Sequence, residues 1–155
     1  MRLEYFQMLD EIEAIDVDKA CLVAVARVPQ ASPVFEGHFP GHPIMPGVLL
    51  LETMAQAAGY LLMALDGFTR MPFFANAKTA NFRSFVLPGS TLKVNAERIH
   101  AGSGYAVVTT SLECNGARVS DARLTMRTVP FPSNALAQHV RREGERLRLT
   151  VAETR

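Results

Sequence analysis

The chain has 155 residues, 48% apolar and 20% charged, which is ordinary for one globular domain with its own core. Its formal net charge of +1 gives no overall field for nucleic acid, so an anionic partner would have to be met by a local patch. Cys21 and Cys114 lie far apart and in no Cys-x-x-Cys pattern, which argues against a disulfide framework or a zinc ribbon and fits a reducing cytoplasm.

The N-terminal half begins with short elements. Apolar residues at helical spacing predict a short amphipathic helix over residues 2–10, and acidic residues there interrupt any continuous apolar run, so this is not a signal peptide. Two strands are expected over residues 12–17 and 20–29. Residues 30–46 are rich in proline and glycine and predict an irregular loop, because each proline disfavours α geometry in the residue before it.

A long apolar helix is expected over residues 46–65. Pro46 suits the first helical turn, and Asp66-Gly67 marks the end. The helix is long enough for a membrane check, but its interior holds Glu52, and a carboxylate at mid-bilayer is costly. We therefore expect a buried core helix and no membrane span.

Four further strands are predicted over residues 73–85, 91–100, 105–114 and 118–129. The turn signals between them are Pro88-Gly89, Gly102-Ser103-Gly104 and Asn115-Gly116, and Asn-Gly between alternating runs predicts a hairpin. One long helix followed by an antiparallel meander predicts an α+β fold, with the sheet curled around the helix.

The tail, residues 131–155, is set apart as a charged C-terminal extension to a domain of residues 1–130. Leu136, Val140 and Leu147 form a weak apolar stripe among arginines and glutamates. A solvated helix is the plainer interpretation, and docking of an acidic carrier protein is the alternative.

The central helix carries its polar residues on one face. Glu52, Gln56 and Gly59 lie at i, i+4 and i+7, while the rest of the helix is apolar nearly all round. Such a stripe must face a seam, a pocket or a partner subunit. A carboxylate satisfied by backbone amides or an arginine is the structural alternative to a catalytic one.

The stretch HFPGHPIMPGVLLLETMAQA, beginning at His38, resembles the signature of the FabZ-type 3-hydroxyacyl-[acyl-carrier-protein] dehydratases, which have the hotdog fold. Phe82-Arg83 and Val86-Leu87-Pro88-Gly89 extend the resemblance, so that it covers about residues 1–129. It implies loss of water from a (3R)-3-hydroxyacyl thioester to give the trans-2-enoyl thioester.

The resemblance also implies roles for particular residues. His38 would remove the C2 proton, because imidazole titrates where a base must work, and Glu52 would protonate the leaving hydroxyl, because burial favours the neutral carboxyl. Free backbone N–H groups near Gly47 and Val48 would receive the negative charge on the thioester oxygen. Gln56 matches the glutamine beside the catalytic pair, and a hydrogen bond at a dimer seam explains it equally well.

The implied partners are an acyl carrier protein and further copies of the chain. In the family, His and Glu of one site come from different subunits of a dimer, usually within a trimer of dimers. No metal or organic cofactor is expected; Pro40 and Pro43 exclude the helix on which an H-x3-H pair such as His38 and His42 would bind a metal. The acyl pocket is expected along the central helix, closed by residues 71–85. The phenylalanines of that segment are more often core residues than tunnel residues, and none is assigned individually.

Departures from the family pattern, such as Ser90 and His42, do not touch the acid or the base. A FabA-type dehydratase/isomerase is one rival, but that relative has Asp at the acid position and Cys in place of Val48. A hotdog thioesterase and a non-enzymatic acyl-binding subunit are the others. Both termini also resemble a variant dehydratase from very-long-chain acyl clusters that supply lipid A.

Overall fold

The structure is a computed structural model that describes residues 1–149. Residues 150–155, the end of the expected extension, lie outside the described part. The elements in chain order are η1 (Leu3–Tyr5), β1 (Glu11–Asp16), β2 (Cys21–Arg27), α1 (Pro33–Gly37), α2 (Gly47–Leu65), β3 (Arg70–Phe82), β4 (Thr91–Gly102), β5 (Tyr105–Cys114), β6 (Ala117–Pro130) and α3 (Asn134–Arg146).

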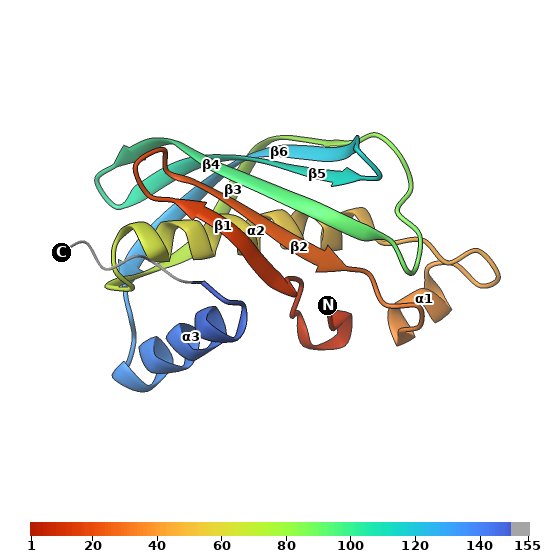
Figure 1. The fold of residues 1–155 in the computed structure, drawn as a ribbon, viewed down its shortest axis with the longest axis horizontal. Helices are drawn as coiled ribbons and strands as arrows, with labels where there is room; N and C mark the ends of the chain where they lie inside the picture. Colours follow the sequence, from red (N-terminus) through yellow and green to blue (C-terminus); the bar gives the residue numbers. More distant parts are fainter. Residues whose placement is uncertain (150–155) are drawn as a thin grey trace.

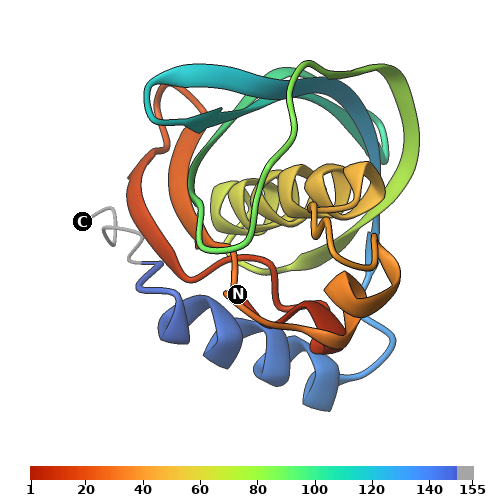
Figure 2. The ribbon, with the colours of Figure 1, turned by 90° about the vertical axis from the view of Figure 1, so that its right-hand side faces the viewer.

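The six strands form one sheet in the order β1-β2-β4-β5-β6-β3, and each neighbouring pair is antiparallel. The sheet curves around α2, and the N-terminal segment and α3 lie on the side of α2 that the sheet leaves open (Figure 1 and Figure 2). This confirms the expected α+β hotdog architecture, an antiparallel sheet wrapped around one long central helix.

Helix α2 forms the centre of the core. It begins directly after Pro46, and its side chains from Leu50 to Ala64 are largely buried against β2, β3, β4, β5 and β6. By length and composition it would be able to cross a membrane, but 67% of its most apolar window is buried inside the fold. The helix is therefore accounted for as the core helix of this domain, because its apolar surface is covered by the sheet.

The hairpin between β5 and β6 confirms its sequence signal. Asn115 and Gly116 both have positive φ, at 51° and 78°, which is the backbone that a tight two-residue hairpin turn requires. The β3 strand begins and ends three residues earlier than expected. Its phenylalanines, which the sequence left unassigned between core and pocket, are not core residues in this chain: Phe73, Phe74 and Phe82 are 45–48% exposed, because β3 is an edge strand paired only with β6.

Two other expectations were wrong. The predicted N-terminal helix is reduced to η1, because Phe6 takes a left-handed backbone (φ 54°) and the chain turns back so that Arg2 and Gln7 pair. The predicted loop contains the short helix α1, since Ser32 accepts a hydrogen bond from Val34 N–H and Pro33 occupies the first turn.

Candidate active site

His38 lies directly after α1, half-buried, in a loop that closes on itself. Its carbonyl accepts a hydrogen bond from Ile44 N–H at 3.0 Å, and its Nδ1 is 3.0 Å from the Ile44 carbonyl oxygen. A carbonyl oxygen can only accept, so Nδ1 carries the proton of this hydrogen bond. In the neutral ring Nε2 is then the basic nitrogen, which is the state that a general base needs.

The loop around His38 is held by further contacts. The Phe39 ring stacks on the His38 ring, with centroids 4.3 Å apart, and the Phe39 and His42 backbones exchange two hydrogen bonds. Met45 N–H donates to the Val86 carbonyl, which ties the end of the loop to the segment after β3. Proline and glycine in this segment thus produce a closed turn that orients the imidazole.

Glu52 lies on α2, half-buried, with one of its two oxygens already engaged. Gln56, one turn later, donates from Nε2 to Oε1 of Glu52 at 2.9 Å and also to the Phe6 carbonyl, and its own Oε1 accepts from Met8 N–H at 3.1 Å. Every hydrogen-bonding group of the carboxamide is therefore used, which fixes its orientation. The Oε2 atom of Glu52 makes no hydrogen bond to any residue that the structure describes.

An open cleft of about 430 Å³ begins at Glu52 and follows α2, a volume within the range of ligand sites. The expected stripe is confirmed, because Glu52, Gln56 and Gly59 all line this cleft. One side is formed by the start of β3 and the other by the N-terminal segment and α3. The remaining lining residues are Tyr5, Phe6, Gln7, Ala55, Tyr60, Met63, Met71, Pro72, Phe73, Phe74, Met126, His139, Val140, Glu143, Arg146 and Leu147.

Gly47 and Val48 form the first turn of α2. Within residues 1–149 their N–H groups make no hydrogen bond, as expected at the start of a helix whose N-cap is Pro46. The Val48 side chain is 74% exposed, and a Cβ added at Gly47 would lie 3.4 Å from the Phe82 ring. The Phe82 ring therefore lies in van der Waals range of Gly47, at the positive end of the helix.

The expected site residues fall into two groups in a single chain. Glu52 and Gln56 share the cleft, whereas His38 is not among the described residues that line it. Phe39 and His42 instead line a separate hollow with the exposed residues Phe85 and Leu87. In the described part of one copy, this cleft therefore holds Glu52 and Gln56 without His38.

Several contacts that hold His38 and Gln56 were not predictable from the sequence. The Ile44, Phe6 and Met8 contacts are made by backbone atoms, which leave no residue-type signal. Tyr60 is different, because it lies eight residues after Glu52 on the same helical face and spacing would have found it. Burial raises the pKa of Tyr60 to about 12, and the Glu143 carboxylate adds to this effect while Arg146 opposes it. Among residues 1–149, no three His, Cys, Asp or Glu side chains gather as metal ligands would.

Comparison with known proteins identifies relatives over most of the chain. Residues 2–123 match the FabA-like domain family. The chain is 38% identical over 122 residues to the 3-hydroxyacyl-[acyl-carrier-protein] dehydratase FabZ of Geotalea uraniireducens, covering 77% of this chain and 83% of that one. It is 37% identical over 131 residues to the FabZ of Thiobacillus denitrificans, covering 81% of this chain and 90% of that one.

A solved structure supports the fold. A hypothetical thioesterase from Streptococcus pneumoniae, crystallised with coenzyme A, superposes with a TM-score of 0.62 at 19% identity, covering 79% of this chain and 88% of that one. At this identity the likeness concerns the backbone architecture alone.

Proposed function

The chain belongs to the FabA-like family, and from that premise we propose that it dehydrates (3R)-3-hydroxyacyl-[acyl-carrier-protein] to the trans-2-enoyl thioester in fatty acid biosynthesis. The observation that carries the proposal is Glu52, whose Oε2 makes no hydrogen bond within residues 1–149, at the beginning of a largely apolar cleft. Such a cleft suits an acyl chain, because burying its methylene groups is favourable.

His38 is proposed as the general base. Its Nε2 takes the proton from C2 of the substrate, and the electron pair of the broken C–H bond forms the C2–C3 double bond. The Ile44 carbonyl supports this role, because it holds Nδ1–H and stabilises the ring as it becomes positively charged. A neutral imidazole is needed at the start of the step.

Glu52 is proposed as the general acid. Its Oε2 proton passes to the 3-hydroxyl group as the C3–O bond breaks, and one water molecule leaves. The hydrogen bond from Gln56 to Oε1 holds the carboxyl in place, so Gln56 acts as a positioning residue through Glu52. The proton taken by His38 and the proton given by Glu52 balance over the reaction.

The N–H groups of Gly47 and Val48 are proposed to bind the thioester oxygen. Negative charge develops on that oxygen as the C2 proton leaves, and uncovered N–H donors at a helix N-terminus stabilise it. Loss of one such donor typically costs about 3–4 kcal/mol of barrier. The proposed steps use these protein groups alone, without a metal or an organic cofactor.

We propose that the complete site forms between two copies of the chain. β3 is an edge strand of 13 residues with Phe73, Phe74 and Phe82 half-exposed, and a long apolar edge of this kind favours pairing with another strand. A dimer through this edge would cover the exposed phenylalanines. It would also offer His38 of one copy to the cleft of the other, and a trimer of such dimers is the expected larger assembly.

The finer assignments follow the same family. The carrier protein is the proposed partner, residues 1–130 are the proposed dehydratase domain, and Cys21 and Cys114, both free in the structure, are compatible with a reducing cytoplasm. Supply of very-long-chain acyl groups for lipid A rests on the resemblance of the termini alone.

The test is incubation of the purified protein with a 3-hydroxyacyl carrier protein, followed by mass spectrometry of the acyl group and chromatographic separation of its double-bond isomers. Loss of one water with the thioester intact supports the proposal. Release of free acid without an enoyl product would assign the protein to the thioesterases instead. A shifted double bond would identify a FabA-type dehydratase/isomerase.

A further inference from the structure

Helix α3 lies outside the family match, which ends at residue 123, yet it is fixed against the domain. Near the end of α2, Arg141 donates to the Gly67 carbonyl at 3.1 Å and lies 5.1 Å from the centre of the Phe68 ring. Gly144 is buried, and a Cβ there would lie 3.2 Å from the same ring. A side chain at position 144 would therefore require the Phe68 ring to shift by a few tenths of an ångström.

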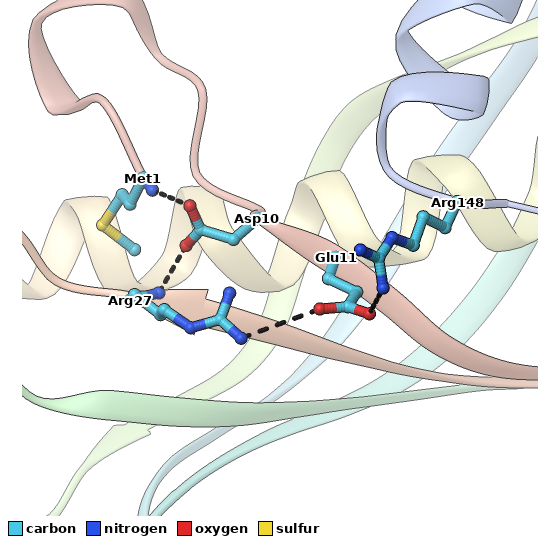
Figure 3. A network of polar contacts seen from close by, with 5 residues as sticks. All are labelled: Met1, Asp10, Glu11, Arg27 and Arg148. Atoms are coloured by element: carbon cyan, nitrogen blue, oxygen red, sulfur yellow. Dashed lines mark hydrogen bonds and ion pairs between the residues drawn. The ribbon is translucent and has the colours of Figure 1, made fainter.

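The other end of α3 is fixed to β1. Ile12 N–H donates to the Leu147 carbonyl at 2.7 Å, and the Leu147 side chain is only 1% exposed within the core. Arg148 pairs with Glu11 at 2.6 Å, and Glu11 also reaches Arg27 at 3.7 Å (Figure 3). Within α3 itself only Gly144 is buried and most side chains are exposed, as expected of a solvated helix, while the two ends of the helix are tied to the domain.

One face of α3 lines the cleft that begins at Glu52. His139, Val140 and Glu143 lie at i, i+1 and i+4 and line the same cleft as Tyr60 and Met63 of α2. Arg146 also lines it and pairs with Glu143 at 2.9 Å. The apolar surface that α2 presents to the cleft is therefore faced by both Val140 and the Glu143–Arg146 ion pair of α3.

We propose that α3 sets the longest acyl chain the cleft accepts, with Val140 as the specificity-determining residue. The inference rests on the proposed function, since it takes the cleft as the acyl site. An aliphatic tail gains free energy where it covers Val140 and Met63. Binding becomes less favourable where the tail displaces water from the Glu143–Arg146 pair, because an apolar tail cannot replace the hydrogen bonds that water made to these charges.

The test compares Val140→Trp and Val140→Ala across 3-hydroxybutyryl, 3-hydroxyoctanoyl and 3-hydroxypalmitoyl carrier proteins. We expect Val140→Trp to lower kcat/KM for the longest chain by roughly 10-fold or more, with little change for the shortest. Val140→Ala should shift the preference toward longer chains. Gln138→Trp is the matched control, because Gln138 is exposed on the same helix and does not line the cleft. Equal changes for all chain lengths would overturn the inference.

A second measurement separates this inference from the proposed reaction. Acyl thioesters that lack the 3-hydroxyl group cannot be dehydrated, so their binding by calorimetry reports the cleft alone. Val140→Trp should weaken binding of the long thioester and spare the short one, even if the protein has no dehydratase activity. An unchanged length dependence of Kd would contradict the role of α3, whatever the reaction proves to be.

Discussion

Gln56 donates a hydrogen bond from Nε2 to Oε1 of Glu52 at 2.9 Å, across one turn of α2. The same carboxamide binds the backbone of Phe6 and Met8, so the carboxyl group and the N-terminal segment are held by one side chain. The position of the proposed acid therefore depends on a segment more than 40 residues away in the sequence.

The first prediction concerns this link. Gln56→Ala removes all three hydrogen bonds and should lower the free energy of unfolding by about 1–3 kcal/mol, because Met8 N–H loses its partner. Turnover should fall by roughly tenfold, equivalent to ~1.4 kcal/mol of barrier, with KM changed less than kcat. Denaturant unfolding and steady-state kinetics check both effects, with Gln138→Ala as the exposed-helix control. Unchanged kcat would show that Gln56 only holds the N-terminal segment.

Glu52→Gln keeps the shape and hydrogen bonding of the side chain but removes its transferable proton. Turnover on a 3-hydroxyacyl carrier protein should therefore fall by a factor of roughly 10²–10⁴. The thermal unfolding midpoint should stay close to that of the wild-type protein. Kinetics and calorimetry on the same preparation measure the two quantities. A variant with near-normal turnover would leave Glu52 a structural role only.

The contact between His38 Nδ1 and the Ile44 carbonyl predicts one tautomer of the neutral ring. Nitrogen-15 NMR of the histidine-labelled protein, with His38→Ala used for assignment, should show Nδ1 bearing the proton and Nε2 unprotonated at a pH where the ring is neutral. The opposite tautomer would remove Nε2 as the base and would require a different proton acceptor.

Tyr60 reports whether α3 covers the cleft. Its phenol is expected to ionise at a pKa of about 12, compared with an ordinary value of 10.0, chiefly because of burial. The raised folded-state pKa means that its contribution to stability is complete below pH 10 and is lost as the pH rises toward 12. Ultraviolet titration, taken as the difference from Tyr60→Phe, measures the midpoint. Arg141→Ala weakens the contact of α3 with Gly67 and Phe68 and should lower the Tyr60 midpoint. A midpoint near 10 in the wild-type protein would contradict the burial of Tyr60 beside α3.

The central helix and the β-hairpins were predictable because local sequence patterns specify them. The apolar run of α2 and the Asn115-Gly116 turn need no distant contact to be recognised, and both were confirmed. The polar face of α2 was also predictable from spacing alone, since Glu52, Gln56 and Gly59 line one cleft.

The remaining features depend on distant parts of the molecule. The N-terminal segment takes its shape from Gln56, so its own helical spacing was misleading. Phe73 and Phe82 have side chains typical of a core but are 45–48% exposed, because β3 lies at the edge of the sheet, and strand order depends on contacts distant in sequence. Helix α3 contacts Phe68 through Gly144 and Arg141, and no pattern within the charged tail indicates these contacts.

The most direct test of a site shared between two copies is complementation between His38→Ala and Glu52→Gln. In a two-fold dimer built from one copy of each, one site lacks both groups and the other keeps both intact. Co-expression with random pairing should therefore restore about one quarter of full dehydratase activity, although each variant alone is nearly inactive. A mixture that forms mixed dimers and stays inactive would contradict the account.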